Sequence, residues 1–431
     1  MPPWLHHRCD AAFVEIEHMP MRTLQKHWFP MMRLPGEHHR RSRCGCVGAS
    51  VGPRPTGTLV MVLLVACLGP GGMGRAADFE TLLVIEPTKE HPRNSEGDIV
   101  QLADGRLCLA YTRFTGGTAD HSAADIVART SDDGGKTWSA DRVIVPNEGQ
   151  ANVMSVSFAR LKTGELLLFY LRKHGWDDLA MFVRRSTDEL ATLSEPVRVT
   201  LGEGYHVVNN GRVVQLRTGR LVVPAALHPC LDGTAKTFQP RAIMRVFFSD
   251  DGGRTWQADA MAPAPPSPTS PMLQEPGIIE LKDGRSMMYI RTNQGTQYEC
   301  FSDDGGVHWT APGPGPLASP LSPATVGRVP WTGDLLAVWN DHSGWHVFPT
   351  GKRTPLCLAV SRDEGRTWSP SRVIEGDPDG WYCYTSMTFV GDRVILSYCA
   401  GDSQVGGLNR LKVVSVGREW LYPVAAKDRV D

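Results

Sequence analysis

The sequence predicts an all-β protein, a six-bladed β-propeller of four-stranded antiparallel blades that occupies residues 78–431. Three observations support this fold class. One short motif recurs along the chain, a second repeat of hairpin turns runs in phase with it, and no useful helical periodicity follows residue 78. Repeats with a period of some tens of residues are typical of solenoids and propellers. Four antiparallel strands per repeat are the unit of a propeller blade.

The recurring motif has the form Ser-x-Asp-x-Gly-x-Thr-Trp, with His308 in place of Thr in one copy. Its clear copies begin at Ser131, Ser249, Ser302 and Ser361, and a worn copy surrounds Ser186 and Asp188. The starting residues are 53 to 63 positions apart. Asp can hydrogen-bond its own backbone two residues on, Gly supplies a positive φ, and Trp packs under the turn, so each copy predicts a tight turn between strands.

The second repeat consists of glycine turns between two apolar runs, each of which predicts a β-hairpin. The turns contain Gly105, Gly164, Gly219, Gly284, Gly333 and Gly391. Each of the first five hairpins is followed by one copy of the motif. Two turns per repeat give four strands, and six repeats give six blades. The early apolar run Phe79 to Pro87 is expected to pair with Leu411 to Val416 in the last blade, which closes the ring without free edges.

Residues 1–77 differ from the rest and are interpreted as a leader with an export signal. Basic residues such as Arg54 precede about a dozen apolar residues in TGTLVMVLLVACLG, and small residues follow near Ala76 and Ala77, where cleavage is expected. Such a run is too short for a stable membrane span. The expected location is therefore secreted or periplasmic. Leu64 to Cys67 also resembles a lipoprotein cleavage box, and only lipidation at Cys67 would make a membrane a partner.

The charge and the cysteines limit the possible functions. Without residues 1–77 the chain has 36 Lys and Arg against 42 Asp and Glu, a net charge of −6. This charge argues against a nucleic-acid partner. Six cysteines remain, and none has a CxxC or His-spaced metal pattern. No metal and no cofactor is expected at the site.

The repeated turns resemble the Asp-boxes of the sialidase (neuraminidase) superfamily, and the resemblance covers about residues 80 to 425. It implies a propeller with a glycoside hydrolase site at its axis. An Asp acid in this family lies on the loop before the first Asp-box, which here is TADHSAADIVARTSDDGG, and Asp120 falls at that position. Asp125 follows five residues later, inside the expected strand.

The other site residues implied by the resemblance come from three later segments. Glu275 and Arg291 lie at opposite ends of the hairpin in PMLQEPGIIELKDGRSMMYIRTNQG. Arg353 precedes the fourth clear Asp-box. Tyr384, in GWYCYTSMTF, matches the family's tyrosine, with Tyr382 as the nearby alternative.

One family position departs from the pattern. The family's first arginine falls near Ser95, whereas Arg93 stands two residues earlier and Glu96 stands beside that position. An acid there would repel a substrate carboxylate. Arg93 and Arg212 are therefore both candidates to complete the carboxylate-binding set.

The chemistry of a sialic acid suits these residue types. Arg guanidinium groups hold a carboxylate by paired, charge-assisted hydrogen bonds. Asp120 would give the leaving oxygen its proton. Tyr384 would attack the anomeric carbon, with Glu275 as its base, which is an exception to the usual pair of carboxylates.

Three functions remain open from the sequence. The first is an exported exo-glycosidase of sialidase type that acts on a sialoglycoconjugate or another acidic oligosaccharide with retention. The second is a non-catalytic propeller that binds glycans. The third is the same scaffold acting on another acidic sugar, such as a uronic acid. An acid and a Glu-activated phenol favour an enzyme, because a binding module needs neither.

Overall fold

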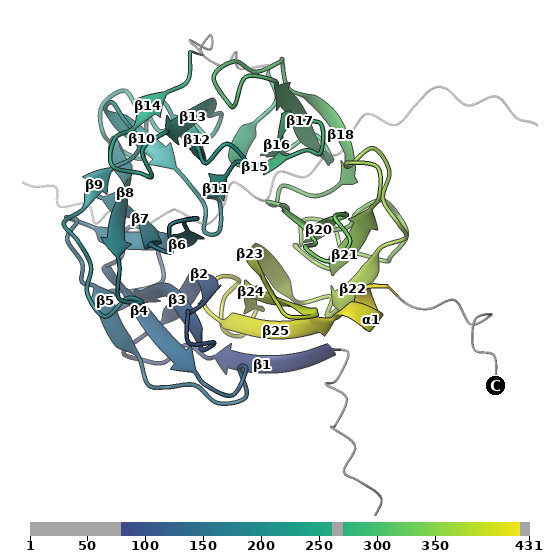
Figure 1. Cartoon of the computed structure of the whole chain (residues 1–431), viewed down its shortest axis with the longest axis horizontal. Helices are drawn as coiled ribbons and strands as arrows, with labels where there is room; N and C mark the ends of the chain where they lie inside the picture. Colours follow the sequence, from purple (N-terminus) through teal and green to yellow (C-terminus); the bar gives the residue numbers. More distant parts are fainter. Residues whose placement is uncertain (1–78, 261–269, 423–431) are drawn as a thin grey trace, which may run out of the picture. The chain divides into compact units, whose positions relative to one another are not determined.

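The computed structural model describes residues 79–260 and 270–422 (Figure 1). The leader expected at residues 1–77, with its export signal and Cys67, lies outside the described residues. The described part is all β, and its helix α1 spans only Arg418–Leu421. No helix among the described residues is long and apolar enough to cross a membrane. The predicted fold class is confirmed.

Four separate antiparallel sheets contain four strands each, and we number the blades along the chain. Blade 1 consists of β2 (Arg93–Gln101), β3 (Leu107–Phe114), β4 (Ala124–Ser131) and β5 (Arg142–Val145). Blade 4 consists of β15 (Leu273–Glu280), β16 (Ser286–Thr292), β17 (Thr296–Ser302) and β18 (Gly313–Ala318). Blade 5 consists of β19 (Thr325–Arg328), β20 (Leu335–Asn340), β21 (Leu356–Ser361) and β22 (Arg372–Glu375). Blade 6 consists of β23 (Trp381–Val390), β24 (Arg393–Gly401), β25 (Leu411–Gly417) and β1 (Phe79–Ile85).

The remaining nine strands form one continuous sheet that contains two further sets of four strands. Blade 2 consists of β6 (Asn152–Arg160), β7 (Leu166–Lys173), β8 (Asp178–Ser186) and β9 (Val197–Arg198). Blade 3 consists of β11 (Val214–Gln215), β12 (Leu221–His228), β13 (Ile243–Ser249) and β14 (Gln257–Ala258). The extra strand β10 (Gly204–Val207) joins them, because it pairs parallel to β8 and antiparallel to β12.

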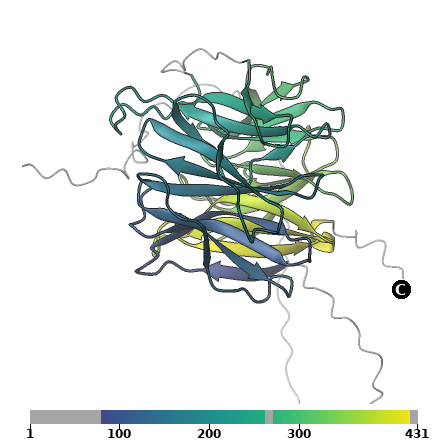
Figure 2. The ribbon, with the colours of Figure 1, turned by 60° about the vertical axis from the view of Figure 1, so that its left-hand side comes forward.

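The blades follow one another around a ring (Figures 1 and 2), and the first strand of each blade is innermost (Figure 1). The innermost strand β2 contacts both β6 and β23, and β19 contacts both β15 and β23. The apolar side chains of the described residues gather in six buried clusters, each shared by two neighbouring blades. Burial of apolar side chains between blades is the main favourable contribution to the stability of such a ring.

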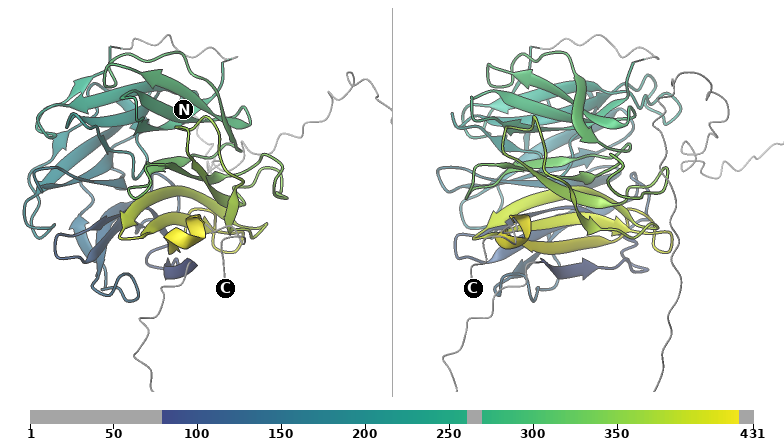
Figure 3. Two further views of the ribbon diagram at one scale, coloured as in Figure 1. Left: turned by 45° about the vertical axis from the view of Figure 1, so that its right-hand side comes forward. Right: turned by 90° about the vertical axis from the view of Figure 1, so that its right-hand side faces the viewer.

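The chain closes the ring as the sequence predicts. The N-terminal strand β1 pairs antiparallel with β25, from Phe79 opposite Val416 to Ile85 opposite Leu411. This strand therefore covers the edge of blade 6, beside helix α1 (Figure 3). A closed ring leaves only short, protected sheet edges.

The Asp-box turns have the hydrogen bonds that their sequence predicts. In the first copy, Ser131 Oγ accepts from the Gly135 N–H at 2.8 Å, and Asp133 accepts from the Thr137 N–H and hydroxyl at 2.9 and 2.7 Å. The worn copy at Ser186 and Asp188 repeats this pattern. Each turn connects the third and fourth strands of its blade, so it lies at the blade end opposite the start of the innermost strand.

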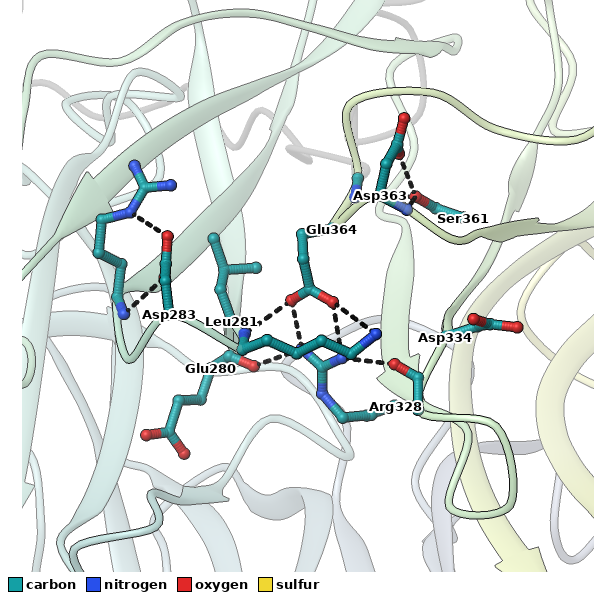
Figure 4. Close-up of polar contacts among 12 residues, drawn as sticks. Glu280, Leu281, Asp283, Arg328, Asp334, Ser361, Asp363 and Glu364 are labelled. Atoms are coloured by element: carbon teal, nitrogen blue, oxygen red, sulfur yellow. Dashed lines mark hydrogen bonds and ion pairs between the residues drawn. The ribbon is translucent and has the colours of Figure 1, made fainter.

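Two of the turns tie neighbouring blades together through a glutamate side chain. Glu364 takes a glycine position of the motif with a φ of 64°. Its carboxylate accepts from the Lys282 N–H of blade 4 at 2.8 Å and from Arg328 at 2.7 and 2.9 Å (Figure 4). Glu189 does the same for blades 1 and 2, with the Ala103 N–H and Arg160 as donors.

Candidate functional site

Four innermost strands contain a β-bulge near their start, and each bulge places one residue in the left-handed region. These residues are Glu96 (φ 54°), Ser155 (φ 57°), Glu275 (φ 47°) and Tyr384 (φ 57°). The strand register shifts at each of them. Left-handed backbone is costly for a residue with a side chain, and bulges that re-aim a side chain are frequent beside active sites. The shared geometry marks this end of the ring as the candidate site.

Glu275 and Tyr384 are in direct contact although they lie far apart in the sequence. The Tyr384 hydroxyl donates to Glu275 Oε1 at 2.9 Å. Arg291, near the end of β16, donates to Glu275 Oε2 at 2.6 Å. Arg353 lies with its guanidinium carbon 5.7 Å from the centre of the Tyr384 ring and 5.1 Å from that of Trp381. We call Glu275, Arg291, Arg353 and Tyr384 the tyrosine cluster.

Burial and nearby charges shift the pKa values of Tyr384 and Glu275 in opposite directions. Burial, followed by the charge of Glu275, raises the pKa of Tyr384 well above its usual value. Burial alone would raise the pKa of Glu275, but the charges of Arg291 and Arg353 outweigh it and lower that pKa. At neutral pH the phenol is therefore protonated and the carboxylate ionised. This is the pairing that a phenol needs to lose its proton during attack.

Tyr382, the alternative to Tyr384, is turned away from this cluster. Its side chain is 7% exposed and lies in the apolar cluster between blades 5 and 6. Its ring meets that of Tyr398 edge-on at 6.5 Å. Residues two apart on a strand normally share a face, but the bulge at Tyr384 separates these two.

A second group of charges surrounds Arg93, which is buried at 2% exposure. Its guanidinium donates to Asp120 Oδ1 at 2.5 Å and to Glu96 Oε1 at 3.0 Å. The other Glu96 oxygen accepts from the Ser155 hydroxyl. Lys173 Nζ donates to the Asp120 backbone carbonyl at 2.7 Å. We call Arg93, Glu96, Asp120 and Lys173 the Arg93 cluster, and its formal charges sum to zero.

The Arg93 cluster shifts the pKa of each acid differently. Burial raises the pKa of Glu96, against the lowering effect of Arg93. Burial would also raise the pKa of Asp120, but the charges of Arg93 and Lys173 lower it overall. The Asp120 side chain is nevertheless 59% exposed, so solvent weakens these charges. Burial lowers the pKa of Lys173 to about 8.

Asn210 connects the two clusters from blade 3. Its side-chain amide donates to the Gly97 carbonyl at 2.7 Å and to the Tyr384 carbonyl at 2.8 Å. Gly97 follows Glu96, so one buried amide holds the backbone of two bulges.

Arg212 does not join either cluster, which corrects its role as a candidate for carboxylate binding. Its guanidinium is buried at 2% exposure and donates to the Tyr289 hydroxyl, Thr325 Oγ1 and the Ala324 carbonyl at 3.1, 3.2 and 2.7 Å. These partners belong to blades 4 and 5, so Arg212 links blade 3 to its neighbours.

Ser155, Lys173 and Asn210 were missed by sequence reasoning as members of the site. A signal was present for two of them. Glu96, Ser155, Asn210 and Glu275 each stand nine residues before the glycine of their hairpin, at Gly105, Gly164, Gly219 and Gly284. The same offset that identifies Glu275 therefore also identifies Ser155 and Asn210.

Comparison with known proteins agrees with this fold. The profile of the BNR repeat-like domain matches residues 105–396. A sialidase of Micromonospora viridifaciens is 24% identical over 333 residues, which are 67% of this chain and 47% of that protein. A sialidase of Bacteroides fragilis (strain YCH46) is 24% identical over 335 residues, 69% of this chain and 58% of that protein. The chain thus spans about half the length of these curated relatives.

Among solved structures, the NanB sialidase of Streptococcus pneumoniae is similar in fold. Its TM-score is 0.60 at 13% sequence identity, over 80% of this chain and 71% of the sialidase chain. At this identity the likeness supports the fold alone.

Proposed function

Because the chain belongs to the sialidase and BNR-repeat superfamily, we propose that it is an exported exo-glycosidase of sialidase type. Its substrate would be a terminal sialic acid, or a related acidic sugar, on a glycan. The observation that carries this proposal is the 2.9 Å contact between the Tyr384 hydroxyl and Glu275 Oε1, with Arg291 on the other Glu275 oxygen and Arg353 against the Tyr384 ring. A protein that only binds glycans has no need of a phenol paired with an ionised carboxylate.

In the proposed reaction, Arg291 and Arg353 bind the carboxylate of the sugar. Tyr384 attacks the anomeric carbon while its proton passes to Glu275 Oε1, and a covalent glycosyl-tyrosine forms with loss of the aglycone. Water then attacks this intermediate, and the phenol leaves and recovers its proton, so configuration is retained. A neutral phenol avoids placing a second carboxylate against the negatively charged anomeric centre.

Asp120 is the proposed proton donor to the leaving oxygen, and its side chain is open to solvent. In the free protein Arg93 and Lys173 favour its ionised form. Asp120 must therefore take up a proton before it can act, which the neighbouring negative charge of a bound substrate would promote. The proposal consequently includes an acidic pH optimum.

The Arg93 cluster favours a second candidate substrate. Arg93 is already neutralised by Asp120 and Glu96, which leaves Arg291 and Arg353 to hold the carboxylate. A uronic acid, whose carboxylate is not on the anomeric carbon, would place less negative charge against Glu96 than a sialic acid does. We therefore keep an acidic sugar of the uronic class beside sialic acid.

The deciding experiment incubates the purified protein with a fluorogenic sialoside and a panel of fluorogenic uronides. Release of the fluorophore by the wild type, and its loss in Tyr384→Phe, is the expected result. Turnover of a uronide alone would assign the second substrate class. Glycan binding in a glycan array without turnover of any substrate would overturn the enzyme proposal in favour of a binding module.

A further inference from the structure

Blade 5 contains, apart from the candidate active site, a group of three side chains of the types that can bind a metal ion. Asp341 directly follows β20, Cys357 is the second residue of β21, and His346 lies on the loop between these strands. Their potential ligand atoms all lie within 4.8 Å of one another. The spacing in the sequence matches no common metal motif, so only the fold brings these residues together.

Asp341 carries a negative charge at a position where the equivalent residue of blade 1 carries a positive one. Leu107 pairs with Ser131 in blade 1, and Leu335 pairs with Ser361 in blade 5, so the two blades share one register. In that register Asp341 stands where Arg113 stands in blade 1. Arg113 donates to Asp141 at 3.3 Å, three residues after the Asp-box Trp. Blade 5 thus has an anion at the place of a cation.

The Asp341 carboxylate is deeply buried, at 1% exposure. Among the described residues it accepts from the Ser343 N–H at 2.9 Å and from the Ser371 hydroxyl at 2.5 Å, and no Lys or Arg forms an ion pair with it. Cys357 is also buried, at 0% exposure. A buried carboxylate with hydrogen-bond donors but no cation beside it is costly, and a bound cation would lower that cost.

We propose that Asp341, His346 and Cys357 bind one divalent metal ion of the zinc class. A thiolate with an imidazole and a carboxylate suits zinc, whereas calcium and magnesium prefer oxygen ligands alone. The Cys357 thiol releases its proton to solvent when the metal binds. Ser371 lies 2.9 Å from His346 Nε2 and also bonds Asp341, so it orients two of the ligands.

A metal at this place fastens the loop that leads to Arg353. The loop begins at Asp341 and presents Trp345 to solvent at 72% exposure. At its end, the Arg353 carbonyl accepts from Asn340 Nδ2 at 2.8 Å and from the Tyr382 N–H at 2.9 Å. The metal would therefore hold both ends of the segment, in a role separate from the chemistry at Tyr384.

The test measures zinc bound to the full chain after treatment with a chelator and dialysis against zinc. About one zinc ion per chain is expected for the wild type. Cobalt in place of zinc should give a thiolate-to-cobalt charge-transfer band that Cys357→Ser abolishes. His346→Gln and Asp341→Asn should each weaken zinc binding at least about tenfold, because even the loss of a residue that only orients a ligand has an effect of that size.

Two matched variants serve as controls. His342→Gln changes the other imidazole of the same loop, which stacks on Phe348 at 3.8 Å, and Cys300→Ser changes a buried thiol in blade 4. Both should bind zinc like the wild type. If Cys357→Ser does not fold, His346→Gln carries the test, because it alters a loop residue. Absence of stoichiometric zinc, or binding that both Cys357→Ser and His346→Gln leave unchanged, overturns the proposal.

Discussion

The Tyr384 hydroxyl meets the requirement for a nucleophile, because it donates to a buried carboxylate whose pKa is lowered. Tyr384→Phe removes the oxygen that forms the covalent bond but keeps the ring against Arg353. We expect kcat to fall by about 10³-fold or more, with little change in ligand affinity. Steady-state kinetics and calorimetric binding of a substrate analogue measure both quantities. Tyr382→Phe is the matched control and should keep kcat within about threefold; retention of activity by Tyr384→Phe would contradict the assigned role.

Asp120 should matter most for substrates whose leaving group needs a proton. For Asp120→Asn we expect a loss of about 10²-fold or more on a natural glycan but less than about tenfold on an activated aryl glycoside. The charge of Arg93 favours ionised Asp120, so the wild-type rate on the natural glycan should rise as the pH falls below neutral. Rates of both substrates across the pH range test this. Equal losses on both substrates would remove Asp120 from the role of acid.

At the scale of the strand, Asn210 connects the backbone of two bulges. Its amide donates to the carbonyls of Gly97 and Tyr384. Asn210→Asp keeps the shape but removes the donors, which we expect to cost about 1–3 kcal/mol and to lower kcat at least about tenfold. Thermal unfolding and kinetics measure the two effects. Asn209→Ala is the control, since the Asn209 amide nitrogen has no hydrogen-bond partner among the described residues.

The Asp-box turns should make the fold sensitive to acid. The hydroxyl and N–H of Thr367 lower the pKa of Asp363 to about 2. A native pKa below the unfolded value, about 3.9, means that the stabilisation is complete above that value and is lost as the pH falls through about 2. Asp363→Asn should therefore lower Tm at pH 7 and have almost no effect near pH 2. Asp303→Asn, at the variable position of another copy, is the control; a Tm difference that does not depend on pH would contradict the prediction.

The repeated turns made most of the fold predictable, because a tight turn depends on local residue types. The partner of β1 also followed from the sequence, since the last repeat lacked a strand. The direction of the Arg212 side chain could not be predicted, because it depends on hydrogen bonds to Tyr289 and Thr325 in other blades. Arg93 reaches Asp120 across a bulge that only the register of β2 against β3 places. Local residue types thus predicted the blades and their turns, whereas long-range packing determines which charged side chains are in contact.

Closure of the ring by β1 should contribute to the stability of the whole molecule. Leu82 is 7% exposed and packs with Ile99, Leu107 and other residues of the cluster between blades 6 and 1. Val84, on the same strand, is 41% exposed. We expect Leu82→Ala to lower the free energy of unfolding by about 2–4 kcal/mol, because it leaves a cavity at the seam, and Val84→Ala to lower it by less than about 1 kcal/mol.

Urea unfolding followed by tryptophan fluorescence reports on the whole ring, because the 12 tryptophans are spread along the sequence. Hydrogen exchange of the β1 amides, which pair with β25, reports on the seam. If β1 holds the ring closed, Leu82→Ala should shift the midpoint for the whole molecule rather than release the seam alone, because every blade buries its apolar face against two neighbours. Loss of amide protection in β1 at a lower urea concentration than the fluorescence transition would mean that the seam opens while the other blades stay folded. Equal shifts for Leu82→Ala and Val84→Ala would mean that burial of β1 does not set the stability of the ring.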